Sequence, residues 1–187
     1  LGTFNITTAA AIVTAAANVK VAKHGNRASS GSMGAADILE ANGVKLDLTP
    51  ENVGTCIDEI GIGFMFAPSF HPAMRFAAGP RRELRVRSVF NLLGPLTNPA
   101  GATRQVIGVA TKDSAEKMAM GLNLLGTRHS WIVHSEDGLD EITTTSQTNI
   151  WEIQGGKIRN YIISPVDAGL NYAILGDLCP TSKQGYL

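Results

Sequence analysis

The segment from residue 105 to residue 134 constrains the fold more than any other part of the sequence. Residues 105–110 and 130–134 are short apolar runs of the kind found in buried strands. Residues 113–125 between them carry apolar side chains at helical spacing and end at Gly126, a typical helix stop. A strand, a helix and a second strand in this order predict two parallel strands with a right-handed crossover.

The remaining patterns extend this unit into an α/β protein. They predict helices over 9–17, 35–42 and 50–60, strands over 19–22 and 62–66, and an antiparallel hairpin of 149–153 and 158–163. Gly155 and Gly156 supply the hairpin turn. Residues 90–99 are rich in turn formers and predict an irregular apolar connection. We therefore expect a mostly parallel central sheet flanked by helices, followed by a C-terminal antiparallel hairpin, in a single domain spanning 1–187.

Composition excludes several classes of function. The chain has 187 residues, 44% of them hydrophobic and 17% charged, with a formal net charge of zero. Proteins that bind nucleic acid or acidic membranes usually carry a basic excess, so neither partner is expected. The alanine-rich run at 8–17 is too short to span a membrane. With only two cysteines, no disulfide framework is expected, and a reducing cytoplasmic location is predicted.

A glycine- and serine-rich segment, residues 23–34, precedes the predicted helix at 35–42. We call this segment the cradle. Its polar and glycine residues include Lys23, His24, Gly25, Asn26, Arg27, Ser29, Ser30 and Gly31. Glycines allow close approach of the backbone to a ligand, and helix N-termini attract anions, so a phosphate group is the natural occupant. The alternative is an ordinary loop with solvated charges, and composition alone does not separate the two.

Two further segments carry chemistry. Asp140 and Glu141 are adjacent acids that follow the second strand of the strand–helix–strand unit, where ligands of α/β sheets bind, and carboxylate oxygens suit Mg²⁺. The alternative is a solvated pair of acids. Residues 75–87 contain five arginines and one acid. They predict either the wall of a small-anion site or a solvated helix face.

Five ordered motifs together resemble one family, the anthranilate phosphoribosyltransferases of the nucleoside-phosphorylase-like phosphoribosyltransferase class. The motifs are residues 3–8, residues 23–40, residues 71–74, residues 91–99 and residues 138–142. The resemblance covers roughly residues 2 to 170, and several motifs in order are more specific than one glycine-rich loop. It implies the phosphoribosyltransferase catalytic-domain fold.

The resemblance also implies a reaction. Phosphoribosyl pyrophosphate and anthranilate would give N-(5-phosphoribosyl)anthranilate and pyrophosphate, a step of tryptophan biosynthesis that uses Mg²⁺. Phosphoribosyl pyrophosphate would contact Thr3, Asn5, Thr7, Thr8, Lys23, His24, Gly25, Asn26, Arg27, Ser29, Ser30 and Gly31. Asn26 and Arg81 would face anthranilate, and Asp140, Glu141 and the hydroxyl of Thr7 would hold Mg²⁺. His24 is a candidate for positioning the amine, and no covalent nucleophile is expected.

Some features depart from the family pattern. A Gly-Thr-Gly-Gly-Asp loop normally precedes the position of Thr3, and an N-terminal helical domain with the homodimer contact precedes that loop. We therefore expect the chain to be incomplete at both ends. Thr7 replaces a serine, Ser32 and Met33 alter the loop's usual Ser-Lys-Ser pattern, and Ala35 replaces a phosphate-contacting serine.

Two other functions stay open. One is a pyrimidine nucleoside phosphorylase-like enzyme, which shares the fold and also binds phosphate. Asp140, Glu141 and Arg81 suit a metal-bound pyrophosphate and an aromatic acid better. The other is a non-catalytic phosphate-binding module. The lack of the pyrophosphate loop in this sequence favours that alternative.

Overall fold

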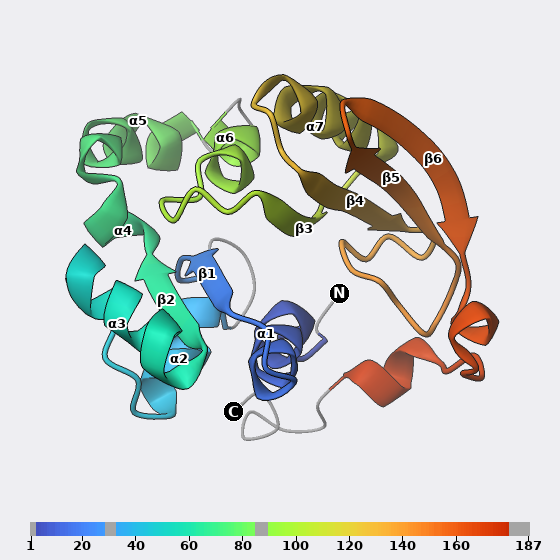
Figure 1. Cartoon of the computed structure of the whole chain (residues 1–187), viewed down its shortest axis with the longest axis horizontal. Helices are drawn as coiled ribbons and strands as arrows, with labels where there is room; N and C mark the ends of the chain where they lie inside the picture. The colour runs from blue at the N-terminus through green and yellow to red at the C-terminus, as the bar shows by residue number, and fades with distance from the viewer. Residues whose placement is uncertain (1–2, 29–32, 85–89, 180–187) are drawn as a thin grey trace. The chain divides into compact units, whose positions relative to one another are not determined.

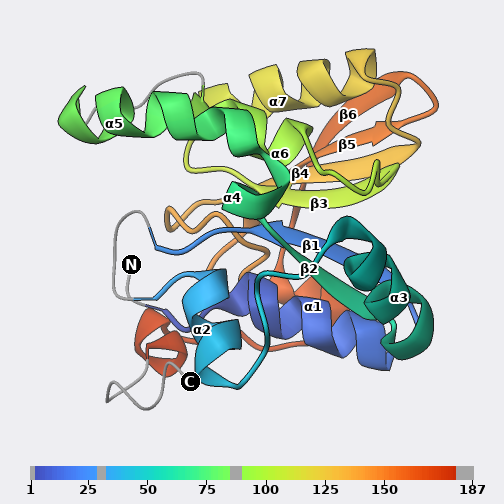
Figure 2. The same cartoon turned by 90° about the vertical axis from the view of Figure 1, so that its left-hand side faces the viewer.

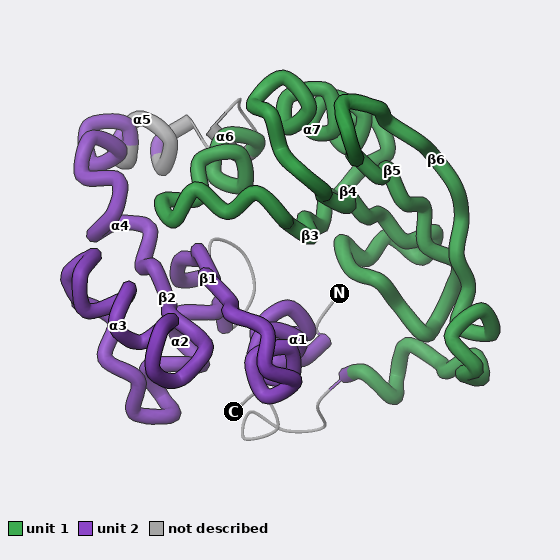
Figure 3. The backbone as a smooth tube through the Cα atoms, viewed as in Figure 1, with its two compact units in different colours: residues 1, 89–178 green, residues 2–88, 179–187 purple. Residues whose placement is uncertain are grey.

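The structure is a computed structural model that describes residues 3–28, 33–84 and 90–179 (Figure 1). The chain divides into two compact units, coloured separately in Figure 3. Unit 1 comprises residues 89–178 with Leu1, and unit 2 comprises residues 2–88 and 179–187. The prediction of one domain over 1–187 stays a prediction.

Unit 2 is built on two parallel strands. Its elements are α1 (Ile6–Ala16), β1 (Val21–Gly25), α2 (Ala35–Ala41), α3 (Pro50–Ile60), β2 (Ile62–Phe66), α4 (Ala67–Phe70), the 3₁₀ turn η1 (Pro72–Met74) and α5 (Arg75–Leu84). The strands pair in parallel from Val21 with Ile62 to Gly25 with Phe66, so they end together. One core cluster of buried residues is formed by Ala36, Leu46 and Phe64.

Local sequence signals explain the α3–β2 unit. Thr49 caps α3, since its side chain accepts a hydrogen bond from the backbone N–H of Asn52, and Pro50 occupies the first turn. Gly61 ends the helix with a φ of 82°. A Cβ at Gly63 would lie 2.7 Å from Ile57 and 2.8 Å from Val53. Only glycine therefore lets α3 pack this closely on β2.

Unit 1 contains the predicted strand–helix–strand unit and the hairpin. Its elements are α6 (Phe90–Leu96), β3 (Arg104–Gly108), α7 (Lys112–Leu124), β4 (His129–Ser135), β5 (Thr148–Gln154), β6 (Lys157–Ile163), and the 3₁₀ turns η2 (Pro165–Ala168) and η3 (Leu175–Leu178). The sheet order is β3-β4-β5-β6. β3 and β4 are parallel, whereas β4–β5 and β5–β6 are antiparallel. Met118 and Leu122 of α7 pack in one core cluster with Ile132 and Trp151.

The α/β class, the parallel strand–helix–strand unit and the C-terminal hairpin are confirmed. The described strands form two sheets, a parallel pair in unit 2 and a mixed sheet of four strands in unit 1. The prediction of an irregular connection over 90–99 is wrong for Phe90–Leu96, which is helix α6. Leu92 and Leu96 pack against the α7 core, and this burial outweighs the local preference of Gly94 and Pro95.

Within the described part of the chain, the helices are too short or too polar to cross a membrane.

Candidate active site

The carboxyl ends of β1 and β2 form the candidate site of unit 2. Parallel strands present ligand sites at this edge. Figure 2 shows α1 and β1 running in opposite directions, so the start of α1 and the end of β1 lie on the same side of the unit. The start of α2 is tied to the same edge, because the N–H of Ala36 donates to the carbonyl of Asn26 at 3.3 Å.

Four of the predicted site residues, Thr3, Asn5, Thr7 and Thr8, lie in or just before the first turn of α1. Asn5 caps the helix, and its side-chain oxygen accepts from the N–H of Thr8 at 3.0 Å. Thr8 is 3% exposed, and its hydroxyl has no hydrogen-bond partner among the described residues. Buried hydroxyls are usually paired, so this hydroxyl calls for a partner that the described residues do not supply, such as water or a ligand. Thr7 is exposed and Thr3 is half-buried.

A pair of histidines adjoins the end of β1. The rings of His24 and His71 lie with their centroids 4.9 Å apart, edge to face at 72°. The Nε2 atom of His71 is buried and lacks a hydrogen-bond partner in the described part of the chain. His71 was not among the predicted site residues. The only sequence feature that could have identified His71 is the motif at 71–74. A single histidine between Phe70 and Pro72 belongs to no periodic pattern that would indicate a site.

Arg27 forms ion pairs with two acidic residues of α2. Its Nη1 and Nη2 atoms donate to the two carboxylate oxygens of Glu40 at 2.7 and 2.9 Å, and Nη1 also donates to Asp37 at 3.1 Å. The hydrogen bonds that Arg27 donates to Glu40 and Asp37 raise the pKa of its guanidinium, and the bond from Arg27 lowers the pKa of Glu40. The guanidinium also lies 5.6 Å from the ring centre of Phe66.

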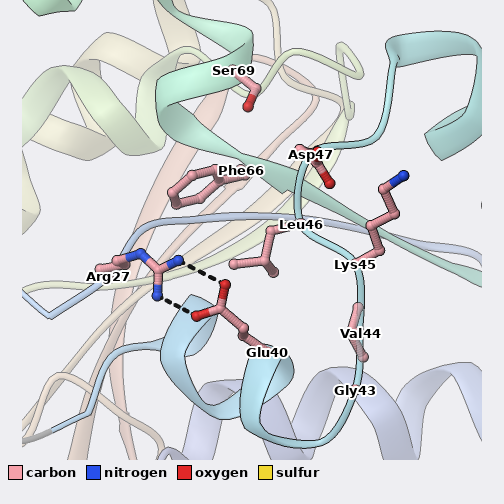
Figure 4. A pocket seen from close by; sticks show the side chains of 9 residues that line it. All are labelled: Arg27, Glu40, Gly43, Val44, Lys45, Leu46, Asp47, Phe66 and Ser69. Atoms are coloured by element: carbon pink, nitrogen blue, oxygen red, sulfur yellow. Dashed lines mark hydrogen bonds and ion pairs between the residues drawn. The ribbon is translucent and has the colours of Figure 1, made fainter.

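An open pocket of about 480 Å³ adjoins this ion pair (Figure 4). Its lining residues are Arg27, Glu40, Gly43, Val44, Lys45, Leu46, Asp47, Phe66 and Ser69. The two basic side chains are balanced by the two acidic ones, so this pocket has no charge excess to attract a phosphate. We therefore assign the candidate anion site to the strand ends rather than to this pocket.

The acidic loop of unit 1 connects β4 to β5. The backbone of Asp140 lies directly against Gly108, the last residue of β3, so close that a Cβ at Gly108 would overlap the carbonyl oxygen of Asp140. Asp140 is exposed and Glu141 is half-buried. The acid pair therefore sits at the carboxyl end of the parallel strands β3 and β4, as the sequence predicted.

Asp137 organises the same loop. Its carboxylate accepts hydrogen bonds from the hydroxyls of Ser135 and Thr145 and, at 3.2 Å, from the N–H of Leu139. Burial raises the pKa of Asp137, but the hydrogen bonds from Ser135 and Thr145 outweigh it, so the pKa lies below its usual value. A carboxylate that accepts several hydrogen bonds in this way fixes the path of the chain towards Asp140.

The donor set of this loop fits Mg²⁺. Asp140 and Glu141 offer only oxygen ligands, which Mg²⁺ prefers, and Mg²⁺ sites often combine one or two carboxylates with substrate phosphates and water. Across residues 3–28, 33–84 and 90–179, no group of three or more histidine, cysteine or acidic side chains is arranged to hold a metal. Any Mg²⁺ held here would therefore need further oxygens, from water or from a substrate.

Several predicted residues have no described surroundings. Ser29, Ser30 and Gly31 lie outside the described residues. Arg81 belongs to α5, but its side chain also lies outside the described set. Lys23 and His24 belong to unit 2, whereas Asp140 and Glu141 belong to unit 1. A common site formed by both groups stays a prediction.

Comparisons with known proteins agree with the motif resemblance. The model of the "Glycosyl transferase family, a/b domain" matches residues 1–185. The anthranilate phosphoribosyltransferase of Cellvibrio japonicus is 57% identical over 167 residues, which cover 89% of this chain and 49% of that protein. The enzyme of the same name from Stutzerimonas stutzeri is 53% identical over 184 residues, covering 98% of this chain and 53% of that protein. The chain thus spans about half the length of the curated relatives it matches.

Solved structures are similar over nearly the whole chain. The crystal structure of anthranilate phosphoribosyltransferase from Thermus thermophilus has a TM-score of 0.89 and 46% identity, covering 100% of this chain and 55% of that one. The Saccharomyces cerevisiae enzyme in complex with PRPP and Mg has a TM-score of 0.88 and 29% identity, covering 99% and 51%. A complex of the yeast enzyme with 4-fluoroanthranilate has a TM-score of 0.82 and 26% identity, covering 99% and 51%.

Proposed function

Because the chain belongs to the glycosyl transferase family, a/b domain, we propose that it carries the site residues of an anthranilate phosphoribosyltransferase. This enzyme transfers the phosphoribosyl group of phosphoribosyl pyrophosphate to the amine of anthranilate and releases pyrophosphate. The observation that carries the proposal is the 53% identity with a relative of that name over 98% of this chain. The reaction belongs to tryptophan biosynthesis.

Phosphoribosyl pyrophosphate is proposed to bind at the carboxyl edge of β1 and β2. Its proposed contacts are Thr3, Asn5, Thr7 and Thr8 at the start of α1 and Lys23, His24, Gly25, Asn26, Ser29, Ser30 and Gly31 in the cradle. Two observations support this set. The first turn of α1 contains no acid that would repel phosphate, and the buried hydroxyl of Thr8 has no hydrogen-bond partner among the described residues.

Mg²⁺ is proposed to be held by Asp140 and Glu141, with the hydroxyl of Thr7 assisting. The related yeast enzyme in complex with PRPP and Mg supports this part of the proposal. When bound, the ion neutralises charge that builds on departing pyrophosphate. The contribution of the chain is to present two carboxylates on a loop whose path is fixed by Asp137 and Gly108.

Anthranilate is proposed to lie beside Asn26 and Arg81, and the related complex with 4-fluoroanthranilate supports an aromatic acid as the acceptor. A guanidinium such as that of Arg81 matches a planar carboxylate with two parallel hydrogen bonds. His24, edge to face with His71, is proposed to position the amine. Positioning and charge stabilisation then drive displacement at the ribose without a covalent nucleophile.

A homodimer formed through helices outside this chain and a cytoplasmic location are further predictions from the sequence. The homodimer is tested by measuring the molar mass in solution of a protein with the length of the relatives. A monomer would contradict it. Neither Cys56 nor Cys179 forms a disulfide in the described part of the chain, and disulfides are rare in a reducing compartment.

Binding and turnover assays test the proposed function. We expect calorimetric titration of the chain with phosphoribosyl pyrophosphate to show binding that is stronger with Mg²⁺ than without it. In a protein of the relatives' length, anthranilate should be consumed with phosphoribosyl pyrophosphate, and thymidine with phosphate should not react. Turnover of thymidine would favour the nucleoside phosphorylase alternative. Phosphate binding without any Mg²⁺ dependence or turnover would favour a non-catalytic module.

A further inference from the structure

The cradle is fastened to α2 on both sides of residues 29–32. The N–H of Ala28 donates to Asp37 Oδ2 at 3.0 Å, and the N–H of Gly34 donates to the same oxygen at 2.8 Å. Asp37 belongs to the first turn of α2. These bonds lower the pKa of Asp37, so the carboxylate is charged at neutral pH. One side chain therefore ties the residues on both sides of 29–32 to the same helix.

Gly34 also lies directly against the backbone of residues 26–28. A Cβ at Gly34 would overlap the backbone nitrogen of Ala28 and would lie 2.6 Å from the carbonyl carbon of Arg27. The carbonyl oxygen of Asn26 would be 2.9 Å away. Only glycine allows this approach, because any larger residue would push the ends apart. The described residues on either side of 29–32 thus meet at Arg27, Ala28 and Gly34, a contact that we call the neck.

Arg27 stands at this neck and faces protein groups. Figure 4 shows its guanidinium directed at the carboxylate of Glu40, with Phe66 beside it. The bidentate bonds to Glu40 and the third bond to Asp37 surround one positive charge with two negative charges. A phosphate at this guanidinium would meet two acids that repel it. Isolated exposed ion pairs contribute little, but a bidentate pair within a network has defined geometry.

We infer that Arg27 is a positioning residue: with Asp37 and Glu40 it forms a latch that holds the cradle on α2, and other donors of the cradle contact the phosphates. The inference rests on the proposed function for its ligand, phosphoribosyl pyrophosphate. It differs from the sequence prediction, in which Arg27 contacts that ligand directly.

The variant Glu40→Gln separates the two roles by the sign of its effect. If Arg27 binds the ligand directly, the change removes an acid that competes for its guanidinium and repels phosphate. The Kd of phosphoribosyl pyrophosphate with Mg²⁺ would then stay constant or fall. If Arg27 is part of the latch, the change removes its bidentate partner and weakens the attachment of the cradle to α2. We expect the Kd to rise about fivefold, the factor that about 1 kcal/mol of lost coupling produces.

Arg27→Gln and the double variant complete a thermodynamic cycle. If both side chains act only through their mutual bonds, the double variant binds no more weakly than Arg27→Gln alone. Additive or opposing effects overturn the latch. The matched control is Asp58→Asn, which removes another exposed ion pair of unit 2, with Lys20, at the same change of charge. Its Kd should equal that of the unaltered chain, and thermal unfolding verifies that each variant is folded.

Amide hydrogen exchange, followed by nuclear magnetic resonance without any ligand, decides the inference independently of the proposed function. Arg27→Gln and Glu40→Gln should each accelerate exchange at Ala28 and Gly34 about fivefold, while the amides of β2 keep their rates. Unchanged exchange at both amides overturns the latch even if phosphoribosyl pyrophosphate binds. If the unaltered chain does not bind this compound, the proposed function fails, and the exchange rates still decide the latch.

Discussion

The carbonyl oxygen of Asp140 occupies the space that a Cβ at Gly108 would fill. This contact joins the last residue of β3 to the loop that carries the proposed metal ligands. The two residues are far apart in sequence, and the absence of a side chain at Gly108 is what permits the approach. The position of the acid pair thus depends on a glycine that belongs to a different element.

Gly108→Ala should therefore displace the acidic loop. We expect the Mg²⁺-dependent part of phosphoribosyl pyrophosphate binding to weaken at least tenfold, and the free energy of unfolding to fall by about 1–3 kcal/mol, the usual range for overpacking. Calorimetric titration with and without Mg²⁺ measures the first effect, and denaturant unfolding measures the second. Gly101→Ala is not a suitable control because Gly101 has a φ of 59°. Gly54→Ala is suitable, and equal Mg²⁺ dependence in Gly108→Ala and Gly54→Ala would contradict the prediction.

Two glycines of one helix–strand unit should respond to alanine in opposite directions. Gly54 lies inside α3, and a Cβ there would meet nothing within 4 Å, so Gly54→Ala should stabilise the chain by about 0.5–1 kcal/mol. Gly63→Ala would place a Cβ 2.8 Å from the carbonyl oxygen of Val53 and should destabilise it by about 1–3 kcal/mol. Urea unfolding of both variants checks the signs. A stabilising Gly63→Ala would show that α3 does not pack on β2 as described.

The elements that sequence predicted well are those with local signals. The bounds of α3 follow from Thr49, Pro50 and Gly61, which act within one helical turn of its ends. The parallel pairing of β3 and β4 follows from the helix between them. Such features need no knowledge of the rest of the fold.

Features that depend on distant residues were not predictable. The contact between His24 and His71 joins two segments that are separated in the sequence by α2, α3 and β2, and no residue spacing predicts it. Helix α6 was missed because its stability comes from packing on α7 rather than from the preferences of Gly94 and Pro95. The ion pair between Arg27 and Glu40 was also not predictable, because an arginine in a phosphate-binding motif predicts a phosphate contact.

Glu152 should stabilise the chain at neutral pH and lose this contribution in acid. This carboxylate accepts hydrogen bonds from His129 at 2.7 Å and Trp131 at 3.1 Å, which lower its pKa below the usual 4.5. A lowered pKa contributes stability above pH 4.5 that is lost as the pH falls through the pKa of the folded state.

Thermal unfolding between about pH 3 and 7 tests this dependence. Glu152→Gln should have a lower Tm than the unaltered chain at pH 7, and the difference should shrink as the pH falls below the folded-state pKa of Glu152. Glu136→Gln, which alters an exposed acid of the same unit, is the control and should follow the unaltered chain. A difference that is constant with pH would mean that the Glu152 charge makes no net contribution.

The acid pair itself gives the sharpest test of the metal proposal. Asp140→Asn with Glu141→Gln preserves side-chain size but removes both negative charges, so Mg²⁺ should no longer strengthen the binding of phosphoribosyl pyrophosphate. The matched control is Asp58→Asn with Glu59→Gln, an adjacent pair of exposed acids in α3. It changes the net charge equally and should keep the full Mg²⁺ effect. If both double variants retain that effect, Asp140 and Glu141 are solvated acids and the ion is held elsewhere. If both lose it, the effect reflects net charge rather than coordination.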